Sequence, residues 1–143
     1  MYCLTLLIMK TISAIIERAS DGTYSVYCEK EIFSGIGPTI EDAQADMLQQ
    51  MAFYRKTAIS EGFKYPQFLD EEYEVRHSLD ARSIINYYVK SGAFTLSSLS
   101  KITGIDQKQL WSYTKGTKPR QAQSERICSG LASLSHDLSA IFV

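Results

Sequence analysis

Polar and basic side chains recur at helical spacing between residues 107 and 115, and they are of the types that hydrogen-bond to DNA. The amide of Gln107 can pair bidentately with adenine, so Gln107 is the best candidate for reading a base. The residues that we expect at base edges are Gln107, Lys108, Trp111 and Ser112. The residues that we expect to neutralise phosphates are Lys101, Lys115, Lys118 and Arg120. The chemistry predicted for this region is therefore recognition of double-stranded DNA.

Three of these side chains have two possible roles at the level of sequence. Lys108 reaches either guanine or a phosphate, and Ser112 contacts either a base edge or the DNA backbone. Trp111 either stacks on the sugar and backbone or seals the core between two helices. The sequence favours neither role for Trp111.

The segment that would position this face has the pattern of a helix-turn-helix. Leu96 and Leu99 place apolar side chains on one face of a first helix, and Ser100 is small enough for close packing. Gly104 supplies the tight turn because it reaches positive φ without a Cβ clash. Ile105 is expected to fill the gap between the two helices. These features coincide, which favours a helix-turn-helix over an ordinary α-hairpin.

The second helix of the motif has its own start and stop signals. Asp106 is expected as its N-cap, with the carboxylate accepting a backbone N–H. Leu110 and Tyr113 return to the core three residues apart, and Gly116 ends the helix. In a helix-turn-helix the outward side of this helix enters the major groove, with its N-terminal residues nearest the bases.

Two further helices are predicted around this motif. Leu79 and Ile84 flank Asp80 as a hydrophobic staple about an N-cap, which predicts a helix over 81–90. A final helix carries an apolar stripe at spacings of four, three and four: Ile127, Leu131, Leu134 and Leu138. We interpret this stripe as part of the protein core in preference to an interface between subunits. Because a helix-turn-helix usually acts as a dimer, this helix with residues 141–143 is also the candidate pairing surface.

The N-terminal half predicts one sheet with one helix across a face, in the order ββ-β-α-β. Strands are expected over 11–18, 24–29, 32–35 and 72–77. Asp21 and Gly22 predict a type I′ hairpin turn, which needs positive φ at both positions. Thr39 is a candidate N-cap for a helix that Gly62 would end. The apolar stripe of this helix is Ala43, Met47, Met51, Tyr54 and Ala58.

Composition supports two domains with different tasks. The chain has 143 residues and a net charge of −1, with 45% hydrophobic and 22% charged residues, as in globular proteins. Residues 1–75 carry six Lys/Arg and twelve Asp/Glu, whereas residues 76–143 carry nine and four. We therefore expect two domains with different tasks, over 1–75 and 76–143, of which the second holds the helix-turn-helix, binds DNA and dimerises. No apolar run is long enough to span a bilayer, and a cytoplasmic location is expected.

Nothing in the sequence indicates catalysis, a metal or a cofactor. The carboxylates of the N-terminal half are interpreted as solvated charge, and two histidines do not make a credible Ser/His/Asp or Cys/His set. Cys3, Cys28 and Cys128 are far apart and odd in number, which argues against disulfides and structural zinc. They are interpreted as small buried or half-buried hydrophobes. We expect no catalytic residue, no metal site and no cofactor.

The stretch IIERASDGTYSVYCEKEIFSGIGPTIEDAQADMLQQM resembles the start of HicB antitoxins, and LDARSIINYY through GTKPRQAQSERI resembles the helix-turn-helix that one branch of that family carries. The resemblance covers roughly residues 10–142. It implies an α+β protein, with a catalytically inactive, partial RNase H-like domain followed by an all-α helix-turn-helix domain. It also implies a type II toxin–antitoxin system, in which the protein blocks a HicA-type mRNA-cleaving toxin and represses its own operon as a homodimer or larger assembly.

The toxin surface cannot be carried over residue by residue, so charge is the guide. An acidic half would attract a cationic RNase, which raises the association rate and the specificity. The candidate toxin-binding residues are Glu17, Glu29, Glu31, Asp70, Glu71 and Glu72. Residues 1–8 precede the usual start of the family, and they are either an upstream extension or a longer first strand.

Two alternative functions remain. One is a one-component transcription regulator whose N-terminal domain senses a ligand or oligomerises, with no toxin partner. The other is an RNase H-like nuclease that a DNA-binding module delivers, with Mg²⁺-dependent cleavage through Glu17.

Overall fold

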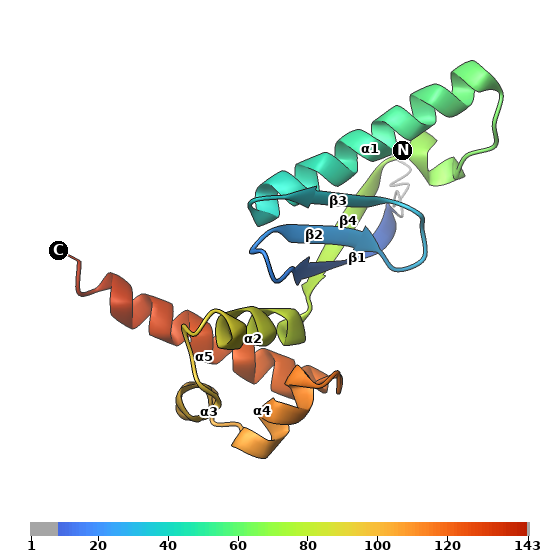
Figure 1. The fold of residues 1–143 in the computed structure, drawn as a ribbon. Helices are drawn as coiled ribbons and strands as arrows, with labels where there is room; N and C mark the ends of the chain where they lie inside the picture. The colour runs from blue at the N-terminus through green and yellow to red at the C-terminus, as the bar shows by residue number, and fades with distance from the viewer. Residues whose placement is uncertain (1–8, 143) are drawn as a thin grey trace, which may run out of the picture. The chain divides into compact units, whose positions relative to one another are not determined.

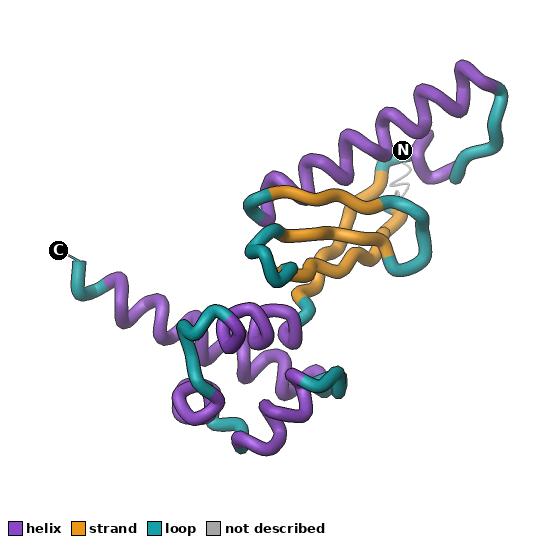
Figure 2. The backbone as a smooth tube through the Cα atoms, viewed as in Figure 1, coloured by secondary structure: helices purple, strands orange, loops and turns teal. Residues whose placement is uncertain are grey.

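The computed structural model describes residues 9–142 and has the mixed α+β composition predicted from the sequence (Figures 1 and 2). The strands are β1 (Lys10–Arg18), β2 (Tyr24–Cys28), β3 (Ser34–Gly37) and β4 (Tyr73–Leu79). The helices are α1 (Ile40–Glu61), α2 (Ala81–Lys90), α3 (Leu96–Thr103), α4 (Gln107–Thr114) and α5 (Gln121–Ser139), with a short 3₁₀ helix η1 (Gln67–Asp70). The expectations about residues 1–8, Cys3 and Val143 lie outside the described residues.

The chain divides into two compact units. Unit 1 contains residues up to Ile16 and Thr23–Leu79, and unit 2 contains Glu17–Gly22 and Asp80–Val143. The division falls after Leu79 and not after residue 75, because β4 continues to Leu79 beside β1. The turn that follows β1 is assigned to unit 2 although it precedes β2 in the sequence.

Unit 1 is a mixed four-stranded sheet of order β3-β2-β1-β4. β2 and β3 are antiparallel, whereas β1 and β4 are parallel, with Lys10 opposite Tyr73 and Ile16 opposite Leu79. β1 thus lies between two strands, and β3 and β4 are the edges. The buried side chains of β1 alternate, as a strand with one face on the core requires: Ile12, Ala14 and Ile16.

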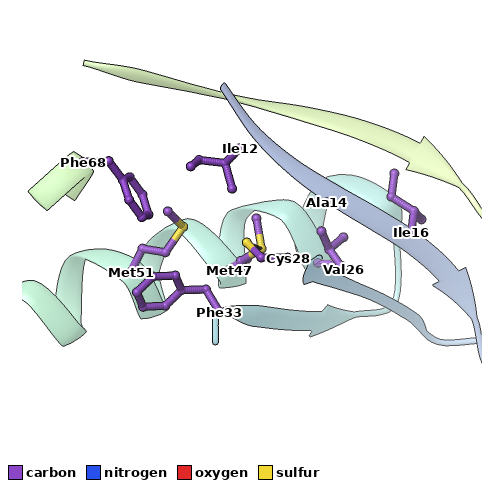
Figure 3. Packing of buried hydrophobic residues seen from close by; sticks show 10 residues of the cluster. Ile12, Ala14, Ile16, Val26, Cys28, Phe33, Met47, Met51 and Phe68 are labelled. Atoms are coloured by element: carbon purple, nitrogen blue, oxygen red, sulfur yellow. Dashed lines mark hydrogen bonds between the residues drawn. The ribbon is translucent and has the colours of Figure 1, made fainter. Parts of the chain in front are cut away.

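Helix α1 packs on the sheet as the apolar stripe predicts. Thr39 is its N-cap, with the hydroxyl oxygen accepting from the Asp42 N–H at 3.1 Å, and Gly62 ends it in the left-handed conformation at φ 77°. The predicted stripe is confirmed: Ala43, Met47, Met51 and Ala58 are buried, and Tyr54 is half-buried. Figure 3 shows Met47 and Met51 pointing from the helix into the same core as Ile12 and Val26.

A glycine allows this helix to lie directly against the edge of the sheet. A Cβ on Gly35 would stand 2.3 Å from the carbonyl oxygen of Ala43 and 2.4 Å from the amide nitrogen of Met47. Any side chain there would collide with the backbone of α1. Close contact between α1 and β3 therefore depends on Gly35.

Local details of the first half differ from the expectations. The type I′ turn is wrong: Gly22 has φ 92°, but no other residue type has positive φ among the described residues, so Asp21 is not left-handed. The Gly22 N–H donates to the Ala19 carbonyl at 3.0 Å, which places Ser20 and Asp21 at the centre of an ordinary turn followed by a left-handed glycine.

Two further elements were misplaced or missed in unit 1. The third strand begins at Ser34 because Phe33 turns into the core, 4% exposed, while its carbonyl accepts from the Cys28 N–H at 2.9 Å. η1 was not expected, and it buries Phe68 edge-on against Phe33.

Of the cysteines, Cys28 is buried as expected, but Cys128 is exposed because it lies on the outer side of α5.

Unit 2 is a group of four helices around a second core. Asp80 caps α2 as predicted, with its carboxylate accepting from the Arg82 N–H at 3.0 Å. The core is formed by Ala81, Ile85, Leu99, Ile105, Leu110, Tyr113 and Ile127. All four helices contribute to it. α3 packs on both α4 and α5, and α2 packs on the same two helices.

Candidate functional site

Helices α3 and α4 are joined by a short, tightly fixed turn. At the start of α3, the Thr95 hydroxyl accepts from the Ser98 N–H and the Ser98 hydroxyl accepts from the Thr95 N–H, both at 3.0 Å. This reciprocal capping box defines where α3 begins. At its end Gly104 is left-handed at φ 72°, and Ile105 is 2% exposed, as predicted.

Thr103 fixes this turn, and the sequence analysis did not identify it. Its side chain is 7% exposed, and the hydroxyl donates to the Leu99 carbonyl at 2.7 Å while accepting from the Ile105 N–H at 3.2 Å. One hydroxyl thus ties the last turn of α3 to the first residue after Gly104. A hydroxyl residue directly before a predicted turn glycine is the sequence signal that could have revealed it.

Helix α4 presents the polar face on which the DNA-binding prediction rests. Leu110 and Tyr113 are 0% and 1% exposed and fix the inward side, as predicted. Gln107 and Lys108 are exposed in its first turn. The N-cap prediction for Asp106 is only half right, because the residue occupies the cap position but its carboxylate makes no capping hydrogen bond.

The structure excludes one of the two roles proposed for Trp111. Its side chain is 55% exposed, so it does not seal the core between the helices. The Lys115 Nζ lies 5.6 Å from the centre of the indole ring, which is a cation–π distance. Ser112 is half-buried, and its hydroxyl donates to the Gln109 carbonyl at 2.6 Å, which leaves only an acceptor lone pair for another group.

The four predicted phosphate-binding side chains are exposed, and they come from two segments of unit 2. Lys101 lies on α3, while Lys115, Lys118 and Arg120 lie in the connection between α4 and α5. The start of that connection is held in place, because Arg82 donates from Nη1 to the Gly116 carbonyl at 2.9 Å.

Along α5 the apolar stripe changes from core to surface. Ile127 is 1% exposed and Gly130 lies against α3, where a Cβ would stand 2.6 Å from the Ile102 carbonyl oxygen. Exposure then rises to 47% at Leu138, and it is 68% and 83% at the residues that follow α5, Ile141 and Phe142. The stripe is therefore core only in its first part, and Figure 1 shows the end of α5 extending past α2, α3 and α4.

The six acidic candidates for toxin binding do not form one cluster of a single unit. Glu17 belongs to unit 2, and the other five belong to unit 1. Asp70 is engaged by Arg55 at 2.7 Å and by the Tyr65 hydroxyl at 2.9 Å, and these hydrogen bonds hold the pKa of its carboxyl below the ordinary value. Glu29, Glu71 and Glu72 are exposed, and Glu31 is half-buried.

Unit 1 also has a groove that the sequence analysis did not anticipate. Its volume is about 740 Å³, and it is lined by β2, β3, the turn between them and α1. Three of the strongly exposed apolar side chains of this unit line it: Ile32 at 75%, Ile36 at 62% and Phe53 at 66%. No periodic pattern predicts it, because the lining residues come from segments that only the fold brings together.

Over residues 9–142, no group of three or more His, Cys, Asp or Glu side chains is placed to hold a metal ion. Within the same range no helix is sufficiently long and apolar to cross a membrane. Comparison with known proteins finds no matching family model, no matching curated protein and no matching solved structure.

Proposed function

We propose that this protein is an antitoxin that neutralises a HicA-type mRNA-cleaving toxin and represses its own operon. The observation that carries the DNA-binding part is the α3–α4 pair. Its turn is fixed by Gly104 and Thr103, and the outward face of α4 bears exposed Gln107 and Lys108. A helix of this kind, supported by a second helix across a short turn, fits the major groove with its N-terminal residues at the base edges.

Under this proposal α3 and α4 form a helix-turn-helix, and α4 is the recognition helix. Trp111 stacks on the sugar and backbone of the DNA, because its exposed side chain is not part of the protein core. The basic side chains around α4 neutralise phosphates and supply the salt-dependent part of the affinity. Unit 2 carries nine Lys/Arg against six Asp/Glu over 17–22 and 80–143, which supports contact with a polyanion.

In this proposal, unit 1 binds the toxin. Over residues 9–16 and 23–79 it carries six Lys/Arg against ten Asp/Glu, a net charge of −4. This field attracts a basic ribonuclease. The mixed sheet with one covering helix is compatible with the partial RNase H-like domain that the resemblance to HicB antitoxins implies, and the proposal assigns it no catalysis.

Dimerisation through α5 completes the proposal. The stripe of α5 has spacings of four, three and four, which is the a/d pattern of a helix pair: Ile127, Leu131, Leu134 and Leu138. Because Leu138 and the following Ile141 are exposed, a second copy of α5 can cover them. Pairing here would relate two copies of α4 by a two-fold axis, as a palindromic operator requires.

Co-expression with the product of the adjacent reading frame tests the antitoxin function. We expect a small basic protein that co-purifies with this chain, arrests growth when expressed alone, and is harmless when the two are expressed together. A DNA fragment from upstream of the pair should bind the purified chain more tightly than an unrelated fragment of equal length. Specific DNA binding without any toxin would instead indicate a one-component regulator.

A substitution in α5 tests the pairing. Leu138→Glu should halve the mass measured by light scattering and weaken operator binding, without lowering the unfolding temperature of the remaining core. Ser133→Glu places the same charge on the same helix outside the stripe and serves as the matched control. An unchanged mass for Leu138→Glu would remove α5 from the interface.

A further inference from the structure

The groove of unit 1 lies along an edge strand that has one backbone N–H already engaged by a side chain. β3 is the last strand of the sheet, and unpaired edges commonly receive a strand from another chain. Here the Ile36 N–H donates to the Asp46 carboxylate of α1 at 2.9 Å. An added strand would have to break this hydrogen bond. This bond makes extension of the sheet less favourable at this edge, so we consider the side chains that line the groove.

The groove combines an apolar floor with exposed apolar walls. Val26 and Phe33 are 0% and 4% exposed at its base, and Phe33 packs edge-on against Tyr54 with ring centres 5.4 Å apart. Ile36 and Phe53 also line the groove, each more than 60% exposed. An aromatic floor beside exposed hydrophobic side chains is suited to receive an inserted aliphatic or aromatic side chain.

One charged group lines the groove, and it is a carboxylate without a cation. Asp46 is half-buried, and within the described chain its hydrogen bond from Ile36 is its one polar contact and it forms no salt bridge. A carboxylate that has no cation of its own favours a Lys or Arg from a partner, with which it can form a charge-assisted hydrogen bond. The net charge of −4 on this unit acts in the same direction.

We infer that this groove is the docking site for the toxin, which inserts an apolar side chain beside Ile36 and Phe53 and places a Lys or Arg on Asp46. The inference rests on the proposed antitoxin function and names the surface that performs it. It moves the centre of the interface from the exposed acidic side chains to the groove. The acidic residues then act mainly at long range, on the rate of association.

Two substitutions separate the apolar and ionic parts of this contact. Phe53→Gln removes one wall of the groove. Asp46→Asn removes the charge while its amide oxygen still accepts from the Ile36 N–H. The matched controls are Phe63→Gln, at a similarly exposed phenylalanine (63%) that does not line the groove, and Glu61→Gln, which removes one carboxylate elsewhere on α1.

The affinity of each full-length variant for the purified product of the adjacent reading frame is measured by calorimetry at two salt concentrations. We expect Phe53→Gln and Asp46→Asn each to raise Kd about tenfold or more. Asp46→Asn should also reduce its salt dependence, while both controls bind as wild type. Circular dichroism and operator binding, unchanged in all four variants, show that each unit is folded.

Three results would overturn the inference, and they are distinguishable. Wild-type affinity in both groove variants, or equal weakening in groove variants and controls, removes the groove from the interface and leaves the antitoxin function standing. No binding of the adjacent product by the wild-type chain overturns the function together with the groove assignment. A smaller mass of Phe53→Gln alone, in light scattering, would show that a second copy of this chain occupies the groove.

Discussion

The guanidinium of Arg18 stacks on the ring of Tyr87, with its Cζ 3.6 Å from the ring centre. The same side chain donates from Nη1 to the Tyr88 hydroxyl at 2.9 Å, and the Arg18 backbone N–H donates to the Ser83 hydroxyl at 3.0 Å. The last residue of β1 thus contacts α2 through a cation–π interaction and two hydrogen bonds. This attachment explains why the turn after β1 belongs to unit 2.

Replacement of Arg18 should destabilise unit 2. Arg18→Met is expected to lower the free energy of unfolding by about 2 kcal/mol, because it removes a partly desolvated cation–π contact and a charged hydrogen bond. Arg18→Lys keeps the charge but not the planar stacking group, and it should recover less than half of the loss. Urea unfolding followed by circular dichroism measures both, and equal stability of all three proteins would contradict the role.

Gly35→Ala should disrupt the contact between α1 and β3. The new Cβ would stand 2.3 Å from a backbone oxygen. Because the groups that it meets belong to the backbone of α1, no side-chain rotation can relieve the clash. We expect a loss of about 3 kcal/mol, at the upper end of overpacking costs. Ser34→Ala, at the exposed neighbour in the same strand, should change the unfolding temperature little.

Gln107→Ala tests the base-reading role on α4. Loss of a bidentate contact should reduce discrimination between operator and unrelated DNA by about 1–3 kcal/mol, while salt-dependent binding to unrelated DNA persists. Fluorescence anisotropy with both duplexes measures this difference. If both affinities fall equally, Gln107 does not read a base.

Lys118→Ala supplies the contrasting case for a phosphate contact. It should weaken binding to both duplexes by a similar factor and reduce the slope of log K against log salt by about 1. An effect on the operator alone would assign Lys118 to base recognition.

His77 should make stability depend on pH. Burial lowers the pKa of this imidazole from 6.5, and its Nε2 is buried without a hydrogen-bond partner among the described residues. The folded state therefore prefers neutral His77. Its contribution is fully present above the pKa of the unfolded chain, near 6.5, and is lost as pH falls from there through the lower pKa of the folded state.

Replacement of His77 isolates this effect. His77→Leu should flatten the fall in unfolding temperature as pH is lowered from about 7, whereas His136→Asn, at the exposed end of α5, should leave the fall unchanged. A directly measured pKa of His77 above 6.5, from an NMR titration, would contradict the assigned cause.

Features that depend on neighbouring residues could be predicted without the folded structure. Thr39 and Gly62 delimit α1, and Gly104 ends α3, because caps and left-handed glycines act within one turn of the chain. The core faces of α1 and α4 follow from periodicity alone. The α+β class follows from the order of these elements.

Features that depend on residues distant in the sequence could not be predicted in this way. The parallel pairing of β1 with β4 spans the whole of unit 1, and no local signal encodes which strands meet. The Asp46 carboxylate of α1 accepts from the Ile36 N–H of the edge strand β3, and Trp111 lies outside the core. Both results depend on how the helices pack. The same apolar period runs along α5, but only packing shows where the core ends and exposed surface begins.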